Sequence, residues 1–123
     1  MAELFSTAFA NLMTGTNIFL MLVAVVVGII FGCVPGLSAA MAIALFLPVT
    51  FGLPQYSAFA LLMALYIGGV SGSLISAILI NVPGSSQSIA TCYDGHPMAV
   101  KGEAHRALGT GMLFSFIGTM FSL

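Results

Sequence analysis

Residues 4–93 contain no aspartate, glutamate, lysine or arginine. This uncharged run takes up most of a chain of 123 residues, of which 60% are hydrophobic and 4% are charged. A soluble domain carries about 25% charged residues, because its surface must face water. A surface that faces lipid needs no such charges. The sequence therefore predicts an all-α integral membrane protein that crosses the bilayer several times.

Clusters of glycine, proline and polar residues divide the chain into four apolar segments, at residues 18–34, 37–50, 56–80 and 107–123. A transmembrane helix needs about 20 apolar residues, so the segment 37–50 is short for a crossing. The segment 56–80 can cross with some tilt. Residues 81–106 are predicted to form a polar loop, and residues 1–123 together a single transmembrane region.

The two basic residues of the chain, Lys101 and Arg106, both lie in the polar loop. Because basic residues concentrate on the cytoplasmic side of membranes, this loop is predicted to be cytoplasmic. If the first two segments both cross, the N-terminus lies outside, whereas a re-entrant first hairpin would reverse the N-terminus. The residues before the first apolar segment contain no lysine or arginine, so we expect no cleaved signal peptide there.

A short sequence occurs twice, each time where a long apolar segment ends. The chain reads Val-Pro-Gly-Leu-Ser at 34–38 and Val-Pro-Gly-Ser-Ser at 82–86. Proline lacks an amide donor and glycine frees the backbone, so each copy is expected to interrupt a helix. Inside a bilayer each unpaired backbone group costs several kcal/mol unless protein, water or a ligand pairs with it.

Two interpretations of these breaks stay open. Interrupted helices in transporters place helix N-termini against anionic groups and free carbonyls against cations. Alternatively, Pro-Gly only turns the chain at a membrane surface. The serines after the second break favour the first interpretation, because neutral donors suit a carboxylate that must be released again, although they also suit a solvated loop. The candidate substrate-binding residues are Pro35, Gly36, Leu37, Ser38, Asn81, Pro83, Gly84, Ser85, Ser86, Ser88 and Thr91.

Glycines recur at helical spacing in two of the apolar segments. Small residues four apart share one helix face and let two helix backbones approach closely. Simple packing is the favoured interpretation, and a sliding or gating surface is the alternative. The candidate helix-packing residues are Gly28, Gly32, Gly68, Gly69 and Gly72.

The remaining reactive side chains indicate neither an enzyme nor a metal site. Cys33 and Cys92 belong to no cysteine or histidine cluster, so no metal ligands are predicted. Asp94-Gly95 and His96-Pro97 are typical of a turn, and no nucleophile and base are paired near them. Two basic residues make no phosphate-binding patch, so no nucleic-acid partner is expected.

Several motifs, in one order along the chain, resemble the TctA family, the large membrane subunit of the tripartite tricarboxylate transporters. The run Gly28-x-x-x-Gly32-x-x-Pro35-Gly36-Leu37 is similar to that family. Further similar stretches lie at residues 41–45, 47–53, 66–69, 77–84, 94–99 and 102–109. The resemblance covers residues 17–118.

The resemblance implies a subunit of a secondary transporter for citrate-like or other organic acids in the bacterial inner membrane. Its implied partners are a small membrane subunit and a periplasmic solute-binding protein, and its implied coupling cation is Na⁺ or H⁺, with no other cofactor. Family members are several times longer and contain a second, related half. The chain thus resembles the N-terminal portion only, an incomplete half of a larger fold, and the alternative is a fragment that acts only in helix packing or subunit assembly.

Two positions depart from the family pattern. Many relatives have glycine where this chain has Ser73, and many have glutamate where it has Ser85. An ion-binding carboxylate at the second position is therefore not expected here.

Overall fold

The computed structural model describes residues 1–122, which form helices joined by short connections and contain no strand. The fold class is therefore all-α, as predicted. In chain order the helices are α1 (Ala2–Leu12), α2 (Gly15–Cys33), α3 (Ala39–Thr50), α4 (Gln55–Ile80), the 3₁₀ turn η1 (Ser86–Ser88), α5 (Ile89–Val100) and α6 (Ala104–Ser122).

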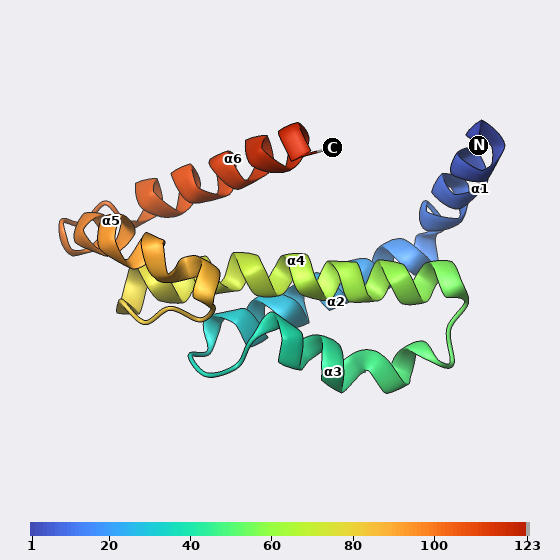
Figure 1. Ribbon diagram of the computed structural model, residues 1–123, viewed down its shortest axis with the longest axis horizontal. Helices are drawn as coiled ribbons and strands as arrows, with labels where there is room; N and C mark the ends of the chain where they lie inside the picture. Colours follow the sequence, from blue (N-terminus) through green and yellow to red (C-terminus); the bar gives the residue numbers. More distant parts are fainter. Residues whose placement is uncertain (123) are drawn as a thin grey trace.

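Helices α2 and α4 run side by side in the same direction, and α3 runs back along them (Figure 1). As a result, the connections that follow α2 and α4 lie toward the same end of the molecule. The short connection between α3 and α4 lies at the opposite end, together with the start of α2 and the helix α1.

The core between α2, α3 and α4 is narrow and built mainly from small residues. Ala24, Ala42 and Ala64 are buried there together with Leu61 and Leu65. Most of the large apolar side chains point outward instead. Small residues at helix contacts and large apolar residues outside are the arrangement expected where lipid surrounds a helix bundle.

Two described helices are long and apolar enough to cross a membrane, α2 with 19 residues and α4 with 26. Within a hydrophobic stretch of 18 residues in each helix, only 17% of the residues of α2 and 39% of those of α4 are buried in the structure. The core helix of a soluble protein would be mostly buried, so these exposed faces favour contact with lipid. Helix α3, with 12 residues, is too short to cross alone.

The predicted polar loop at residues 81–106 contains a 3₁₀ turn and a helix, α5, and α6 begins within it, so the prediction of a loop was wrong for residues 86–100 and 104–106. Asp94-Gly95 and His96-Pro97 lie inside α5 rather than in turns. Tertiary packing explains the difference: a Cβ atom added at Gly95 would lie 2.7 Å from Cγ1 of Ile78, so the glycine is needed for close approach to α4. Pro97 stands near the end of α5 and is exposed.

Candidate functional site

The first break, at residues 34–38, is a sharp reversal between α2 and α3. Val34 leaves the helix in an extended conformation, and Gly36 takes a positive φ of 95° that favours glycine. Ser38 is the N-cap of α3, where its side-chain oxygen accepts a hydrogen bond of 3.3 Å from the amide of Met41. The amides of the first turn of α3 before Met41 have no partner within the helix.

This first break lies beside the middle of α4. A Cβ atom at Gly69 would lie 2.6 Å from Cβ of Ala39, the first residue of α3, and Gly32 of α2 packs against the carbonyl group of Gly69. Gly69 precedes the end of α4 at Ile80 by about 16 Å of helix, at about 1.5 Å per residue. The break is therefore well inside the length of α4 rather than level with its end.

The second break, at residues 81–85, brings the chain back along α4. Asn81 ends α4 in the left-handed conformation, with φ 58°, and the chain then returns toward the centre of the helix (Figure 1). Gly84 lies against α2 and α4, because an added Cβ would be 2.5 Å from the carbonyl oxygen of Gly32 and 3.0 Å from Oγ of Ser76. The structure thus brings both breaks to one place.

The 3₁₀ turn after this break, η1, also lies against the middle of α4. The side-chain nitrogen of Gln87 lies 3.5 Å from the hydroxyl of Tyr66, which precedes Ile80 by about 21 Å of helix. From there α5 runs back toward the end of α4. Residues 81–100 therefore form a re-entrant segment. Its first arm, residues 81–85, is extended, and its second arm, residues 86–100, is helical.

Buried hydroxyl groups fill the place where the breaks meet. Ser73 and Ser76 of α4 and Ser88 of η1 are each at most 2% exposed. Ser85 donates to the hydroxyl of Ser73 over 3.1 Å, and Ser73 donates to the carbonyl of Val70 over 2.7 Å. Ser73 and Ser85, the two departures from the family pattern, are therefore direct neighbours.

The hydroxyls of this cluster mostly donate to the backbone. Ser76 donates to the carbonyl of Ser73 over 3.1 Å and Ser88 to that of Ser85 over 2.9 Å, while the amide of Ser85 donates to the hydroxyl of Ser88 over 3.3 Å. Only the hydroxyl of Ser85 donates to another side chain.

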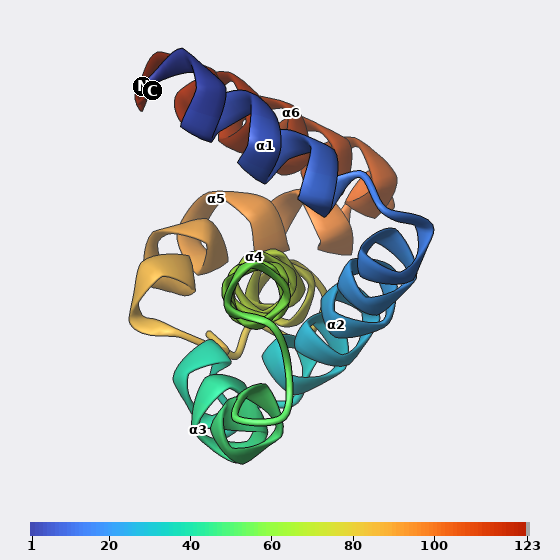
Figure 2. The ribbon, with the colours of Figure 1, turned by 90° about the vertical axis from the view of Figure 1, so that its right-hand side faces the viewer.

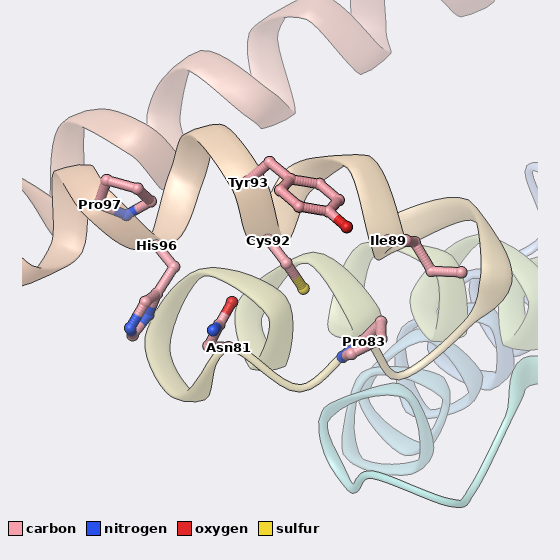
Figure 3. Close-up of a pocket in the computed structure, with 7 residues that line it drawn as sticks. All are labelled: Asn81, Pro83, Ile89, Cys92, Tyr93, His96 and Pro97. Atoms are coloured by element: carbon pink, nitrogen blue, oxygen red, sulfur yellow. The ribbon is translucent and has the colours of Figure 1, made fainter.

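A cleft of about 440 Å³ opens between the second break and α5, as Figure 3 shows. The side chains of Cys92 and His96 lie across it from the break, and Nδ1 of His96 is 3.1 Å from the carbonyl oxygen of Ile78 in the last turn of α4. The cleft is lined by Asn81, Pro83, Ile89, Cys92, Tyr93, His96 and Pro97.

The structure places nine of the eleven predicted substrate-binding residues in three groups, and Ser86 and Thr91 stand apart. Ser85 and Ser88 belong to the hydroxyl cluster and Gly84 packs beside it, whereas Asn81 and Pro83 line the cleft. The residues 35–38 form the first break, in which Pro35 and Gly36 are exposed and Leu37 and Ser38 are half-buried. Ser86 is exposed in η1.

Thr91 does not join the other predicted residues. It lines a separate cleft of about 310 Å³ that Ile78, Asp94 and Thr110 also line, between α4, α5 and α6. Thr91 was predicted to lie with the serines because residues 81–106 were expected to form a loop. In a helix that begins at Ile89, Thr91 points to a different face from Cys92 and His96.

Cys92, Tyr93 and His96 are site-lining residues that sequence reasoning missed. Together with Ile89 they are three or four positions apart, which places them on one face of α5. That spacing was visible in the sequence, but it carries meaning only if residues 89–100 form a helix.

The five predicted packing glycines lie where α2, α3 and α4 approach one another most closely. A Cβ atom at Gly28 or Gly32 would meet the backbone of α4, and one at Gly68 or Gly72 would meet the backbone of α2. Gly69 faces both α2 and the first residue of α3. The backbone groups of the two longest apolar helices are thus in direct contact.

Comparison with known proteins gives one family and one relative. The model of the tripartite tricarboxylate transporter TctA family matches residues 18–123. A 52.8 kDa Agrobacterium vitis protein, described as uncharacterised and encoded in the TAR-I ttuC' 3' region, is 40% identical over 111 residues. The match covers 90% of this chain but 22% of that relative, so the chain spans about a fifth of the relative's length. No solved structure matches the chain.

Proposed function

Because the chain belongs to the TctA family of tripartite tricarboxylate transporters, we propose that it forms the N-terminal part of a membrane subunit that carries an organic acid. The proposed setting is the bacterial inner membrane, which the subunit crosses several times. The proposed partners are the remaining part of the large subunit, a small membrane subunit and a periplasmic solute-binding protein.

The proposal rests on one observation: the breaks that follow α2 and α4 both lie beside the middle of α4. Helix α3 begins there at Ala39, and η1 begins there at Ser86. The first amides of a helix lack intrahelical partners and stand at the positive end of its dipole. Two such ends at one place favour an anionic group, and a carboxylate is the anionic group of the proposed substrate.

The absence of charged side chains from residues 4–93 fits a carrier that releases its substrate. A lysine or arginine at this depth would bind a carboxylate strongly and would cost several kcal/mol to bury when the site is empty. Helix ends and hydroxyls attract the anion more weakly. In the proposed bound state the Ser85 hydroxyl turns from Ser73 to a carboxylate oxygen.

We further propose that uptake is coupled to Na⁺ or H⁺. The last carbonyls of a broken helix are free to face a cation. The end of α2, at Cys33, supplies such carbonyls beside the first break. A glutamate common at position 85 in relatives is absent here, so the proposed cation ligands are backbone carbonyls and hydroxyls.

The rival proposal is a fragment that serves only helix packing or subunit assembly. The glycines of α2 and α4 do not favour it, because they are already in contact with each other within the chain. Helix α6 favours it instead: Gly109, Gly111 and Gly118 have open space where a Cβ would stand, and most of α6 is exposed. An assembly contact, if it is the role, is therefore proposed for α6.

Uptake of radiolabelled citrate or a similar acid by the complete subunit with its partners tests the proposal. Gly36→Ala and Gly84→Ala are expected to abolish uptake, because each change displaces one arm of the site. Gly15→Ala, in open space at the start of α2, is the matched control and is expected to retain it. Unchanged uptake in both break variants would remove the site.

A further inference from the structure

Helix α1 separates its apolar and polar side chains onto opposite faces. At 3.6 residues per turn the two sets of five residues fall on opposite halves of the helix. The apolar half consists of Leu4, Phe5, Ala8, Phe9 and Leu12, and the other half of Glu3, Ser6, Thr7, Ala10 and Asn11. Helix α2 has no comparable polar face, because nearly all of its residues are apolar.

Helix α1 lies crosswise to the two long helices. Figure 2 looks along α4, which appears end-on, whereas α1 appears from the side. None of the residues of α1 is buried. With 11 residues, α1 is about 16 Å long, which is too short for a hydrocarbon core of about 30 Å. A short, crosswise and amphipathic helix matches a membrane interface in both length and direction.

A polar junction fixes α1 level with the first turns of α2 and α4. The side-chain nitrogen of Asn17 donates to the carbonyl of Asn11 over 2.7 Å, at the C-terminal end of α1. The side-chain oxygen of Asn17 accepts a hydrogen bond of 2.6 Å from Ser57 in the first turn of α4. Since α4, with 26 residues, is long enough to span the bilayer, its first turn marks one edge of the bilayer, and the start of α2 lies level with that turn.

An apolar groove of about 430 Å³ separates α1 from α2. Phe9 and Leu12 line it from α1, and Met21 and Val25 line it from α2. These side chains offer water no hydrogen-bond partner, whereas a lipid acyl chain gains contact with all of them. The groove continues the apolar half of α1 toward the membrane-spanning surface of α2.

We propose that α1 lies flat in the lipid–water interface, with its apolar half among lipid acyl chains and its polar half among the headgroups. Acyl chains of the bilayer occupy the groove between α1 and α2, and Asn17 holds α1 in this position. The proposal is independent of transport, and α1 lies before the residues that the family model matches.

Single tryptophan reporters test this proposal, because the chain contains no tryptophan. Phe9→Trp places the reporter on the apolar half of α1, and Thr7→Trp is the matched variant on the polar half. Each variant is reconstituted in phosphatidylcholine–phosphatidylglycerol vesicles whose acyl chains carry bromine either near the headgroup or near the chain end. Bromine quenches only a nearby indole.

Bromine near the headgroup is expected to quench the reporter at position 9 several times more strongly than the reporter at position 7. Equal quenching at both positions by bromine near the chain ends would mean that α1 is inserted, and would overturn the proposal. Absence of quenching at both positions would overturn it as well. Asn17→Ala is expected to reduce the difference between the two positions, and an undiminished difference would overturn the role of Asn17.

Discussion

The two breaks share the sequence Val-Pro-Gly, yet their glycines act in different ways. After α2, Gly36 needs a positive φ of 95°, and a Cβ there would meet nothing within 4 Å. After α4, Gly84 is not among the described residues with positive φ, but a Cβ there would lie 2.5 Å from the carbonyl oxygen of Gly32. One glycine permits a backbone conformation, and the other permits close packing.

The difference follows from the lengths of the two preceding helices. Helix α2 ends beside the middle of α4, so its chain must reverse at once into α3. Helix α4 continues for about 16 Å beyond Gly69, and the chain that leaves it can return along its flank. The same dipeptide therefore gives a tight bend in one place and a re-entrant arm in the other.

The largest expected effect concerns the contact on which both breaks depend. Gly32→Ala would bring a Cβ against the backbone of Gly69, with Cα at 3.0 Å, so α2 must move away from α4. We expect a loss of about 3 kcal/mol in the free energy of unfolding. Gly109→Ala, in open space on α6, should instead stabilise by up to about 1 kcal/mol through helix propensity. Chemical denaturation in detergent, followed by circular dichroism, measures both. Equal effects would contradict the packing account.

Substitution by alanine and by asparagine at each position distinguishes the role of Gly36 from that of Gly84. Gly36→Ala and Gly84→Ala should each cost about 1–3 kcal/mol, the first through backbone strain and the second through overpacking. Asparagine tolerates positive φ, so Gly36→Asn should cost less than Gly36→Ala. Gly84→Asn should cost more than Gly84→Ala, because the larger side chain has no space. If alanine and asparagine rank in the same order of stability cost at both positions, the two glycines have the same role.

A smaller effect is expected from the hydroxyl pair that only the second break has. Ser85→Ala and Ser73→Ala each remove one side of the 3.1 Å hydrogen bond. A double-mutant cycle should give a coupling free energy of about 1 kcal/mol. Denaturation of the two single variants and the double variant measures it. A coupling near zero would mean that the second break does not rest on Ser73.

The smallest effect is expected beyond the re-entrant arm, where the loop before α6 meets the first turn of α6. Glu103 and Arg106 form a pair at 3.6 Å, but their side chains are 47% and 69% exposed. Glu103→Gln should change the free energy of unfolding by less than about 0.5 kcal/mol. A loss comparable to that of Gly84→Ala would mean that charge in this loop, rather than packing against α4, holds the second break in place.

The class of protein and the position of the breaks could be predicted from the sequence, because both depend on local composition. The uncharged run at 4–93 indicates lipid contact, and Pro-Gly cannot continue a helix. The all-α class needed no knowledge of tertiary contacts.

Helix α5 and the cleft beside it could not be predicted in the same way. Asp94-Gly95 and Pro97 favour turns locally, and packing against α4 explains a helix there, because Gly95 contacts Ile78 and Nδ1 of His96 lies 3.1 Å from the carbonyl oxygen of Ile78. The grouping of Ser85 with Ser73, and the separation of Thr91 from both, depend on the return of the chain along α4. Such a path is a property of helix lengths and packing, which no single motif contains.

The central claim is that both breaks lie level with the middle of α4. Spin labels at Ala40 and Ser86, two exposed residues just after the breaks, test it most directly by their depth in a reconstituted bilayer. Labels at Ile67, in the middle of α4, and at Phe51, in the connection between α3 and α4, provide the scale. The account predicts that both test labels lie within about one helical turn, 5.4 Å, of the Ile67 label. Depths at the headgroups for both labels would contradict it.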